Sequence, residues 1–413
     1  MTPSAQIAAV IEVLAAIEEA PGKSADAIVN TYFRARRYIG SGDRRAISDR
    51  VWTLIRGQRQ LQWRLGGAAS PRLTVAASLL LEGWTVSGVE QIYSGARFAP
   101  APLTRAELGR LGAMQSRAGE GAEMPLPVRL ELPDWLLPRL QARFGARFEA
   151  ETAALSKPAP LDLRVNLLKA TREQARLALL EEGLEAEPTP FSPWGLRLAG
   201  RHAITSGAAF RQGLVEPQDE GSQLVAALVG ARPGMRVLDW CAGAGGKTLA
   251  LAMTMQNRGR LVACDVSAAR LENAVRRLRR AGAHNVERHV ISVRDKWRKR
   301  HVASFDRVLV DAPCSGTGRW RRSPDARHRL TERGLAEMVA RQASILDQVA
   351  NLVRNRGRLV YATCSLLTEE NEAQVSTFLS RHPDFARAGP DLALTPAQHG
   401  TDGFYAAVLE RAK

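Results

Sequence analysis

The chain has 413 residues, of which 45% are hydrophobic and 24% are charged, which excludes a disordered or fibrous protein and allows two or three globular domains. Its net charge is +16, and most of the cationic side chains are arginines. Either the protein is basic without a polyanionic partner or it binds nucleic acid. We favour the second interpretation, because cations that neutralise phosphates release counterions and so supply affinity.

Cysteine use and hydropathy indicate the compartment. The four cysteines, at positions 241, 264, 314 and 364, form no C-x-x-C pair and have no histidine at zinc-ligand spacing. We therefore expect neither a metal site nor disulfides. The apolar run at the N-terminus contains acids, unlike a signal peptide, and no apolar stretch reaches the roughly 18 residues of a membrane span. These features predict a cytoplasmic protein.

The N-terminal part, from about residue 7 to residue 111, has apolar residues at helical spacing with arginines between them, as in "DRRAISDRVWTLIRGQRQLQWRL". The small, polar stretch "GAMQSRAGEGAEMP" (112–125) is typical of a linker. Residues 133–145 and 171–184 then predict helices, and residues 161–169 and 194–200 predict strands. We expect an all-α domain over 1–125 and a small α+β domain over 126–215.

The remaining residues, 216–413, alternate between strands and helices. Short apolar strands are predicted at 236–240, 260–266, 307–313 and 357–364, and Ser267 is the expected N-cap of a helix between two of them. This alternation predicts a Rossmann-like α/β domain with a doubly wound parallel sheet. Ligands of such sheets lie beyond the carboxyl ends of the strands.

A glycine-rich turn, "LDWCAGAGGKT" (238–248), follows the first of these strands. It is not a P-loop, because Cys241 stands where that motif requires glycine, and it is not a dinucleotide motif, because Thr248 takes the place of the third glycine. Asp265 ends the next strand, where an acid suits the hydroxyl pair of a ribose. The turn and the acid together predict a ligand that contains adenosine.

Two cysteines lie where strands end. Cys314 follows Asp311 in "DAPCSGTG", and Cys364 lies between the last strand and a helix in "ATCSLLTEEN", whereas Cys264 lies inside a strand and is expected to be structural. A thiolate that adds to C6 of a pyrimidine makes C5 nucleophilic, and the adduct must then lose the C5 proton and expel the thiol. Two thiols and an acid that holds N3 suit this reaction, although local chemistry alone does not say which thiol attacks. The arginines around Trp320 suit phosphates and a stacked base.

The motifs "DWCAGAGGKT", "DAPCSGTG", "RRSPD" and "YATCSLLTEENEAQV" together resemble the RNA cytosine-5 methyltransferases of the Sun (Fmu) and nucleolar p120 family, over roughly residues 130–413. The helical N-terminus resembles the antitermination-factor-like RNA-binding domain that precedes this enzyme in the bacterial type acting on small-subunit ribosomal RNA. The resemblance implies S-adenosyl-L-methionine as cofactor, Cys364 as the attacking thiol and Cys314 as the thiol that assists release.

The resemblance also implies the remaining site residues. We expect the catalytic residues to be Cys364, Cys314, Asp311 and Lys247. We expect the cofactor-binding residues to be Cys241, Ala242, Gly243, Ala244, Gly245, Gly246, Lys247, Asp265, Arg270, Ser292 and Asp311. We expect the RNA-binding residues to be Arg34, Arg36, Arg37, Arg44, Arg45, Arg319, Trp320, Arg321 and Arg322. The family usually has an acid near the adenine where this chain has Ser292, so either Ser292 or Asp295 is expected to make that contact.

The expected function is methylation of a cytosine at C5 in RNA, with 16S ribosomal RNA or a small-subunit assembly intermediate as the partner. We expect a monomer that binds neither a membrane nor a metal. Two alternatives remain at this point: the same chemistry on tRNA, and a non-catalytic RNA-binding factor in ribosome assembly. The intact Cys364, Cys314 and Asp311 argue against the second alternative, because a pure binder gains nothing from two thiols.

Overall fold

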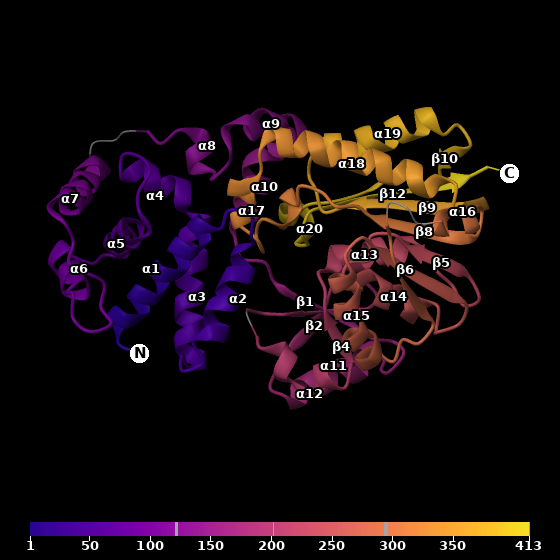
Figure 1. Ribbon diagram of the computed structural model, residues 1–413, viewed down its shortest axis with the longest axis horizontal. Coiled ribbons are helices and arrows are strands. Elements are labelled where there is room, and N and C mark those ends of the chain that lie inside the picture. The colour runs from indigo at the N-terminus through magenta and orange to yellow at the C-terminus, as the bar shows by residue number, and fades with distance from the viewer. Residues whose placement is uncertain (120–122, 201, 293–295, 413) are drawn as a thin grey trace. The chain divides into compact units, whose positions relative to one another are not determined.

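The computed structural model describes residues 1–119, 123–200, 202–292 and 296–412, and it divides into two compact units (Figure 1). The helical unit comprises Met1–Ala142 and the segment Trp320–Leu330. The second unit comprises Arg143–Arg319 and Thr331–Lys413, and it is called the catalytic unit here because it contains the residues expected to be catalytic. The three domain ranges expected from the sequence stay a prediction, because contacts divide the chain into these two units instead.

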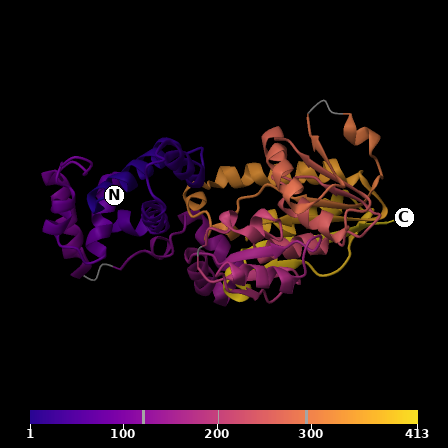
Figure 2. The same ribbon diagram turned by 90° about the horizontal axis from the view of Figure 1, so that it is seen from below.

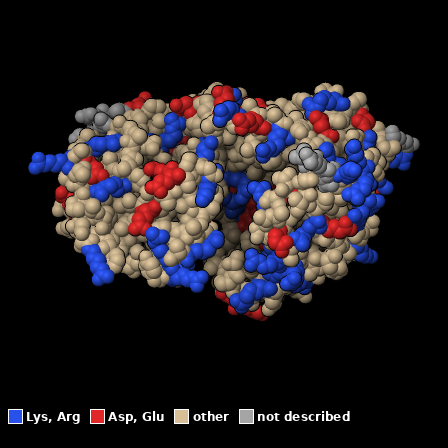
Figure 3. Space-filling model, viewed as in Figure 1, with Lys and Arg blue, Asp and Glu red and all other residues tan. Residues whose placement is uncertain are grey.

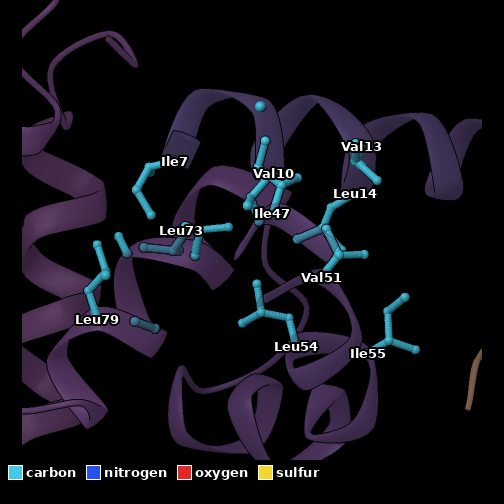
Figure 4. Close-up of a cluster of buried hydrophobic side chains, with 14 of the residues drawn as sticks. Ile7, Val10, Val13, Leu14, Ile47, Val51, Leu54, Ile55, Leu73 and Leu79 are labelled. Atoms are coloured by element: carbon cyan, nitrogen blue, oxygen red, sulfur yellow. The ribbon is translucent and has the colours of Figure 1, made fainter. Parts of the chain in front are cut away.

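The helical unit is built around a single apolar core. Its helices are α1 (Pro3–Glu19), α2 (Ala25–Ala35), α3 (Ser41–Arg56), α4 (Gln58–Arg64), α5 (Pro71–Leu81), α6 (Val86–Ile92), α7 (Arg105–Gly119), α8 (Leu126–Arg129), the first part of α9 (Leu137–Phe144) and α17 (Asp325–Arg329). Val10 and Val13 of α1 meet Ile47 and Val51 of α3 in this core, together with Leu73 of α5 (Figure 4). Side chains three and four positions apart lie on one face of a helix, so the predicted all-α architecture is confirmed.

The predicted linker is largely helical. Helix α7 continues to Gly119, through most of the stretch expected to connect two domains. Leu111 and Met114, three residues apart, are buried in the core of the helical unit and anchor this part of the helix. Small and polar composition was therefore misleading here, because two buried side chains suffice to continue the apolar face.

The segment Trp320–Leu330 belongs to the helical unit although it follows the cysteine motif of the catalytic unit in sequence. Trp320 is 0% exposed and Arg327 is 1% exposed, and the Arg327 guanidinium lies 5.0 Å from the centre of the Trp320 ring. Arg327 also donates to the backbone carbonyl of Glu131 at 3.2 Å. An Asp325 carboxylate oxygen accepts from the buried backbone N–H of Ala25, at the first residue of α2, at 3.0 Å. The helical unit is thus assembled from two separate parts of the chain.

The catalytic unit begins with a small antiparallel sheet in the order β2-β3-β1-β4. Its strands are β1 (Leu161–Val165), β2 (Ala186–Pro188), β3 (Gly195–Leu198) and β4 (Val215–Pro217), and its helices are α10 (Phe148–Ser156), α11 (Arg172–Glu181) and α12 (Ala208–Arg211). The predicted strands correspond to β1 and β3, and the predicted helix corresponds to α11. Short strands such as β2 and β4 have too few residues to show a clear alternation.

The large sheet has the strand order β10-β12-β9-β8-β5-β6-β7, with β11 paired to β12. Figure 2 shows the same ribbon from below. Its strands are β5 (Arg236–Asp239), β6 (Arg260–Asp265), β7 (Val286–Val290), β8 (Phe305–Asp311), β9 (Val353–Thr363), β10 (Phe385–Arg387), β11 (Leu392–Leu394) and β12 (Phe404–Arg411). The four predicted strands correspond to β5, β6, β8 and β9, which are parallel. The sheet is mixed rather than purely parallel, because β12 pairs with β9 in the antiparallel sense.

Helices cover both faces of the large sheet. They are α13 (Glu220–Leu228), α14 (Gly246–Thr254), α15 (Ala268–Ala281), α16 (Trp297–Arg300), α18 (Glu332–Ala350) and α19 (Glu372–Arg381), whereas α20 (Pro396–His399) packs against α10. Figure 1 shows α18 and α19 on one face and α13, α14 and α15 on the other. The Ser267 hydroxyl accepts from the backbone N–H of Arg270, which confirms the predicted N-cap of α15. Among the described residues, no helix combines the length and apolar character that a membrane span requires.

Candidate active site

The candidate site lies at the carboxyl edge of the parallel strands, where β5, β6, β8 and β9 end. Cys241 follows β5, Asp265 and Asp311 are the last residues of β6 and β8, and Cys364 directly follows β9. Parallel strands bring their carboxyl ends to one edge of a sheet, so residues far apart in sequence meet there. The fold therefore brings together most of the catalytic and cofactor residues expected from the sequence.

The glycine turn is fixed by Asp265. One carboxylate oxygen of Asp265 accepts from the backbone N–H of Gly243, and the other accepts from the backbone N–H of Ser267, both at 2.8 Å. Gly245 has φ +81° and caps α14, and a Cβ there would lie 3.1 Å from the Cβ of Ala274. Glycine is needed at this position for both its backbone conformation and its close packing.

A pocket of about 410 Å³ opens beside this turn. Of the expected cofactor residues, Cys241, Asp265, Arg270 and Asp311 line it. The other lining residues are Trp240, Val266, Ile291, Pro313, Arg341, Ile345 and Gln348. Flat apolar walls suit an adenine ring and the Asp265 carboxylate suits ribose hydroxyls, so the residues present fit S-adenosylmethionine.

Sequence reasoning missed some of the residues around this pocket. Ser292 is exposed, and its neighbour Ile291 is the residue that lines the pocket. Asp295, the alternative contact to the adenine, lies outside the described residues. Arg341, Ile345 and Gln348 come from α18. The helical pattern of that segment predicted the helix but gave no sign that it borders the pocket.

Lys247 and Asp311 form a close ion pair. The Lys247 ammonium lies 2.6 Å from an Asp311 carboxylate oxygen, and it also lies 5.4 Å from the centre of the Phe404 ring. Lys247 is only 8% exposed, whereas Asp311 is partly exposed toward the pocket. This contact orients the Asp311 carboxylate and leaves the acid accessible to a ligand.

Cys314 and Cys364 form a hydrogen-bonded pair of thiols. Their sulfur atoms lie 3.4 Å apart, and both side chains are partly buried. The hydrogen bond with Cys314 lowers the pKa of Cys364, and the nearby cations Arg319 and Lys247 act in the same direction against the opposing effect of burial. The same hydrogen bond, with burial, raises the pKa of Cys314. The cations near Cys364 therefore favour Cys364 as the thiolate of the pair.

The other two cysteines differ from this pair. Cys264 is fully buried within β6, as expected of a structural residue. Cys241 lines the pocket, but burial, together with the charges of Asp311, Asp239 and Asp265, raises its pKa. The environment of Cys241 therefore does not favour a reactive thiolate.

The expected RNA-binding arginines of the helical unit lie at its surface. Arg34, Arg37 and Arg45 are exposed. Arg36 pairs with Glu12 at 3.0 Å, and Arg44 donates to the carbonyl of Ile39. Figure 3 shows further Lys and Arg side chains gathered over the part of the catalytic unit formed by α11, α12 and α15.

The residues after Cys314 require a correction. Trp320 is 0% exposed and Arg321 is 5% exposed, because both are packed inside the helical unit. Their burial contradicts the expected stacking of Trp320 on a base and the expected contact of Arg321 with phosphate. Arg319 is exposed and Arg322 is partly exposed. An alternation of arginines and an aromatic residue does not distinguish a surface loop from one that is docked.

Comparison with known proteins identifies relatives along most of the chain. A sequence family described as 16S rRNA methyltransferase RsmB/F matches residues 226–410, and a ferredoxin-like domain of the same methyltransferases matches residues 132–205. The chain is 34% identical over 288 residues to ribosomal RNA small subunit methyltransferase B of Photorhabdus laumondii, which covers 68% of this chain and 66% of that protein, just under two thirds. It is also 34% identical over 307 residues to a probable ribosomal RNA small subunit methyltransferase B of a Synechocystis strain, which covers 70% of this chain and 69% of that protein.

Solved structures extend this likeness. PH0851 has a TM-score of 0.82 and 26% identity, and the match covers 100% of this chain and 99% of that one. A methyltransferase homologue from Pyrococcus horikoshii has a TM-score of 0.62 and 28% identity over 69% of this chain and 97% of that one.

Proposed function

Because this chain belongs to the 16S rRNA methyltransferase RsmB/F family of S-adenosylmethionine-dependent enzymes, we propose that it methylates C5 of a cytosine in small-subunit ribosomal RNA. The observation that carries the proposal is the pair of sulfur atoms, 3.4 Å apart, between the ends of β8 and β9. A cytosine-5 reaction needs a nucleophile for C6 and a second group for the release step. The pair supplies both.

The reaction begins at Cys364, whose lowered pKa increases the thiolate fraction. The thiolate adds to C6 of the cytosine, and the electron density that this places at C5 makes that carbon a nucleophile. Asp311 holds the N3 edge of the ring, and Lys247 fixes the orientation of the Asp311 carboxylate. Asp265 and the apolar walls of the pocket would hold the cofactor, which when bound would supply an electrophilic methyl group.

Release requires Cys314. Its proton having gone to solvent, the Cys314 thiolate takes the C5 proton, and the electron pair of the C5–H bond forms the C5–C6 double bond. The Cys364 sulfur leaves with the electron pair of the S–C6 bond and is again a thiolate. The raised pKa of Cys314 makes its thiolate the stronger base of the two. The different environments of the two thiols thus support different roles.

The target base has to leave its stack to reach the sulfur of Cys364, as in other enzymes that act on a base held in a helix. The exposed arginines of the helical unit, Arg34, Arg37 and Arg45, supply phosphate contacts that do not depend on sequence. The net charge of +16 supports this role.

The test combines methyl transfer with trapping of the covalent intermediate. The protein is incubated with methyl-labelled S-adenosylmethionine and either 16S rRNA or tRNA from cells that lack it, and labelled 5-methylcytidine is measured. We expect label in 16S rRNA. Label in tRNA alone would mean that the substrate is tRNA and not 16S rRNA. The absence of labelled 5-methylcytidine from both RNAs would overturn the proposal.

The cysteine roles are tested by substitution. Cys364→Ala is expected to abolish turnover without a covalent product, and Cys314→Ala is expected to accumulate a protein–RNA adduct that survives denaturing electrophoresis. Cys264→Ala is the matched control, because this thiol is buried within a strand, and its turnover should be retained. An adduct with Cys364→Ala instead would reverse the two roles.

A further inference from the structure

A buried carboxylate lies behind the two cysteines. Glu370, in the short 3-10 helix Thr368–Glu370, is 0% exposed. One carboxylate oxygen accepts from the backbone N–H of Ser315 at 2.8 Å and from the side-chain amide of Gln342 at 2.9 Å. The other accepts from the Ser315 hydroxyl at 2.5 Å. A buried carboxylate is costly unless it is hydrogen-bonded, so this geometry has to be maintained by the fold.

These contacts fix the loop that carries Cys314. Ser315 directly follows Cys314, and both its backbone N–H and its hydroxyl are held by Glu370. Gln342 of α18 also donates to the carbonyl of Pro313 at 3.0 Å, so the peptide groups on both sides of Cys314 are anchored. Glu370 and Gln342 therefore fix the backbone position of Cys314, and the charge of Glu370 also contributes to the raised pKa of the Cys314 thiol.

The loop that carries Cys364 is held mainly by other anchors, although the Ser315 hydroxyl also lies 3.2 Å from the Ser365 hydroxyl. The Cys364 carbonyl accepts from the backbone N–H of Gly318 at 3.0 Å. The side-chain amide of Asn371 donates to the carbonyl of Ser365 at 2.9 Å, and its oxygen accepts from the Thr363 hydroxyl at 2.6 Å. None of these three bonds passes through the Glu370 carboxylate. Loss of that carboxylate should therefore displace Cys314 more than Cys364.

We propose that Glu370 is a positioning residue that sets the distance between the two thiols by holding the Cys314 loop, and that it serves the release step of the reaction. The inference rests on the proposed function, in which Cys314 takes the C5 proton. A displacement of a reacting group by about 1 Å can slow a step by about 100-fold. A chain without this carboxylate should therefore form the Cys364 adduct normally and release it slowly.

Two substitutions separate geometry from charge. Glu370→Ala removes all three hydrogen bonds to the carboxylate. Glu370→Gln preserves them, because its amide oxygen accepts from Ser315 N–H and Gln342, and its amide nitrogen donates to the Ser315 hydroxyl, which can accept as well as donate. If position is what matters, the glutamine variant should rescue release. The matched control is Glu369→Ala, which removes the neighbouring glutamate.

The experiment measures three quantities for each variant with 16S rRNA: the rate of adduct formation in a single turnover, the rate of adduct decay, and the affinity for S-adenosylmethionine by calorimetry. Glu370→Ala is expected to slow decay by about 10- to 100-fold, with formation and cofactor affinity close to wild type. Glu370→Gln and Glu369→Ala are expected to release the adduct like wild type.

Several results would overturn the inference. One is a folded Glu370→Ala protein whose adduct decays as fast as the wild-type adduct. Another is a Glu370→Gln protein that releases the adduct as slowly as Glu370→Ala does, because the charge of Glu370 rather than the position of the loop would then be required. If Glu370→Ala does not bind cofactor, Ser315→Ala decides. It removes the hydroxyl contact with Glu370, together with a contact to the Ser365 hydroxyl, and keeps the backbone N–H contact. Slower decay supports the role and unchanged decay refutes it. Cys314→Ala is run in parallel. If that variant traps no adduct, the proposed function itself fails, and this inference with it.

Discussion

The docked segment of the helical unit allows a quantitative test through Asp325. Its carboxylate is 6% exposed and accepts from the N–H of Ala25, a residue that is 0% exposed, at 3.0 Å. Asp325→Ala leaves this buried N–H without its acceptor. An unsatisfied buried donor costs about 1–3 kcal/mol, and loss of a capping side chain typically costs about 1 kcal/mol. The ion pair of Asp325 with Arg329, which is partly exposed, adds less than about 1 kcal/mol.

We therefore expect Asp325→Ala to lower the free energy of unfolding by about 2 kcal/mol. For a unit of this size, each kcal/mol shifts the midpoint of thermal unfolding by roughly 2–4 °C, so the midpoint should fall by roughly 4–8 °C. The assay is calorimetry with and without S-adenosylmethionine. A bound ligand raises the stability of the catalytic unit and so identifies which transition belongs to the helical unit.

The control for this prediction is Asp134→Ala in the same unit. Asp134 pairs with Arg59 at 2.9 Å, but its side chain is 75% exposed, so this substitution should cost less than about 1 kcal/mol. Equal shifts for the two variants would refute the reasoning. A shift confined to the transition that responds to the cofactor would refute it as well, because Asp325 would then belong energetically to the catalytic unit.

Three further predictions concern the catalytic unit. Arg319→Gln removes a cation that favours the Cys364 thiolate, so it should raise the pKa of Cys364. The rate of adduct formation, measured in single turnovers across pH, should then begin to rise at a higher pH. An unchanged pH profile would exclude this role of Arg319. The guanidinium of Arg164, in β1, donates to the carbonyl of Gly246 in the glycine-rich turn at 2.7 Å. Arg164→Met should therefore weaken cofactor binding about tenfold, as measured by calorimetry. An unchanged affinity would contradict this prediction. Burial raises the pKa of Asp239 to about 7, so the folded protein holds this proton more tightly than the unfolded chain, and stability is lost as the pH rises toward 7. The free energy of unfolding of the wild-type protein, measured in urea, should fall by roughly 3 kcal/mol between about pH 5 and about pH 8 because of this group. Asp239→Asn should lack this fall. If the free energies of unfolding of the two proteins change with pH in parallel, the assignment is refuted.

The strands of the large sheet were predictable because they are short apolar runs that end at chemically distinctive residues. Asp265 and Cys364 could be placed at strand ends from the sequence alone, and the shared edge of a parallel sheet then brings them together. The antiparallel β12 was not predicted, because the direction of a strand depends on how the chain returns to the sheet and not on local composition. The second half of helix α7, residues 112–119, was also missed, since its buried face is set by the core against which it packs.

Contacts between segments far apart in sequence limited the prediction of the site. The segment around Trp320 has the composition of a loop that binds nucleic acid, and only the three-dimensional packing reveals that Trp320 is buried. Glu370 was visible in "TEEN", but its role depends on Ser315, 55 positions earlier in the chain. Local patterns report which side chains are present, and the long-range fold decides which of them can act together.

The split composition of the helical unit has a consequence for synthesis on the ribosome. A nascent chain that has reached Ala142 already contains most of that unit, but the acceptor for Ala25 and the guanidinium that binds the Glu131 carbonyl come from Asp325 and Arg327. These contacts cannot form until translation has passed Leu330, after the Cys314 motif has been made. The helical unit is therefore completed only when most of the catalytic unit has already left the exit tunnel.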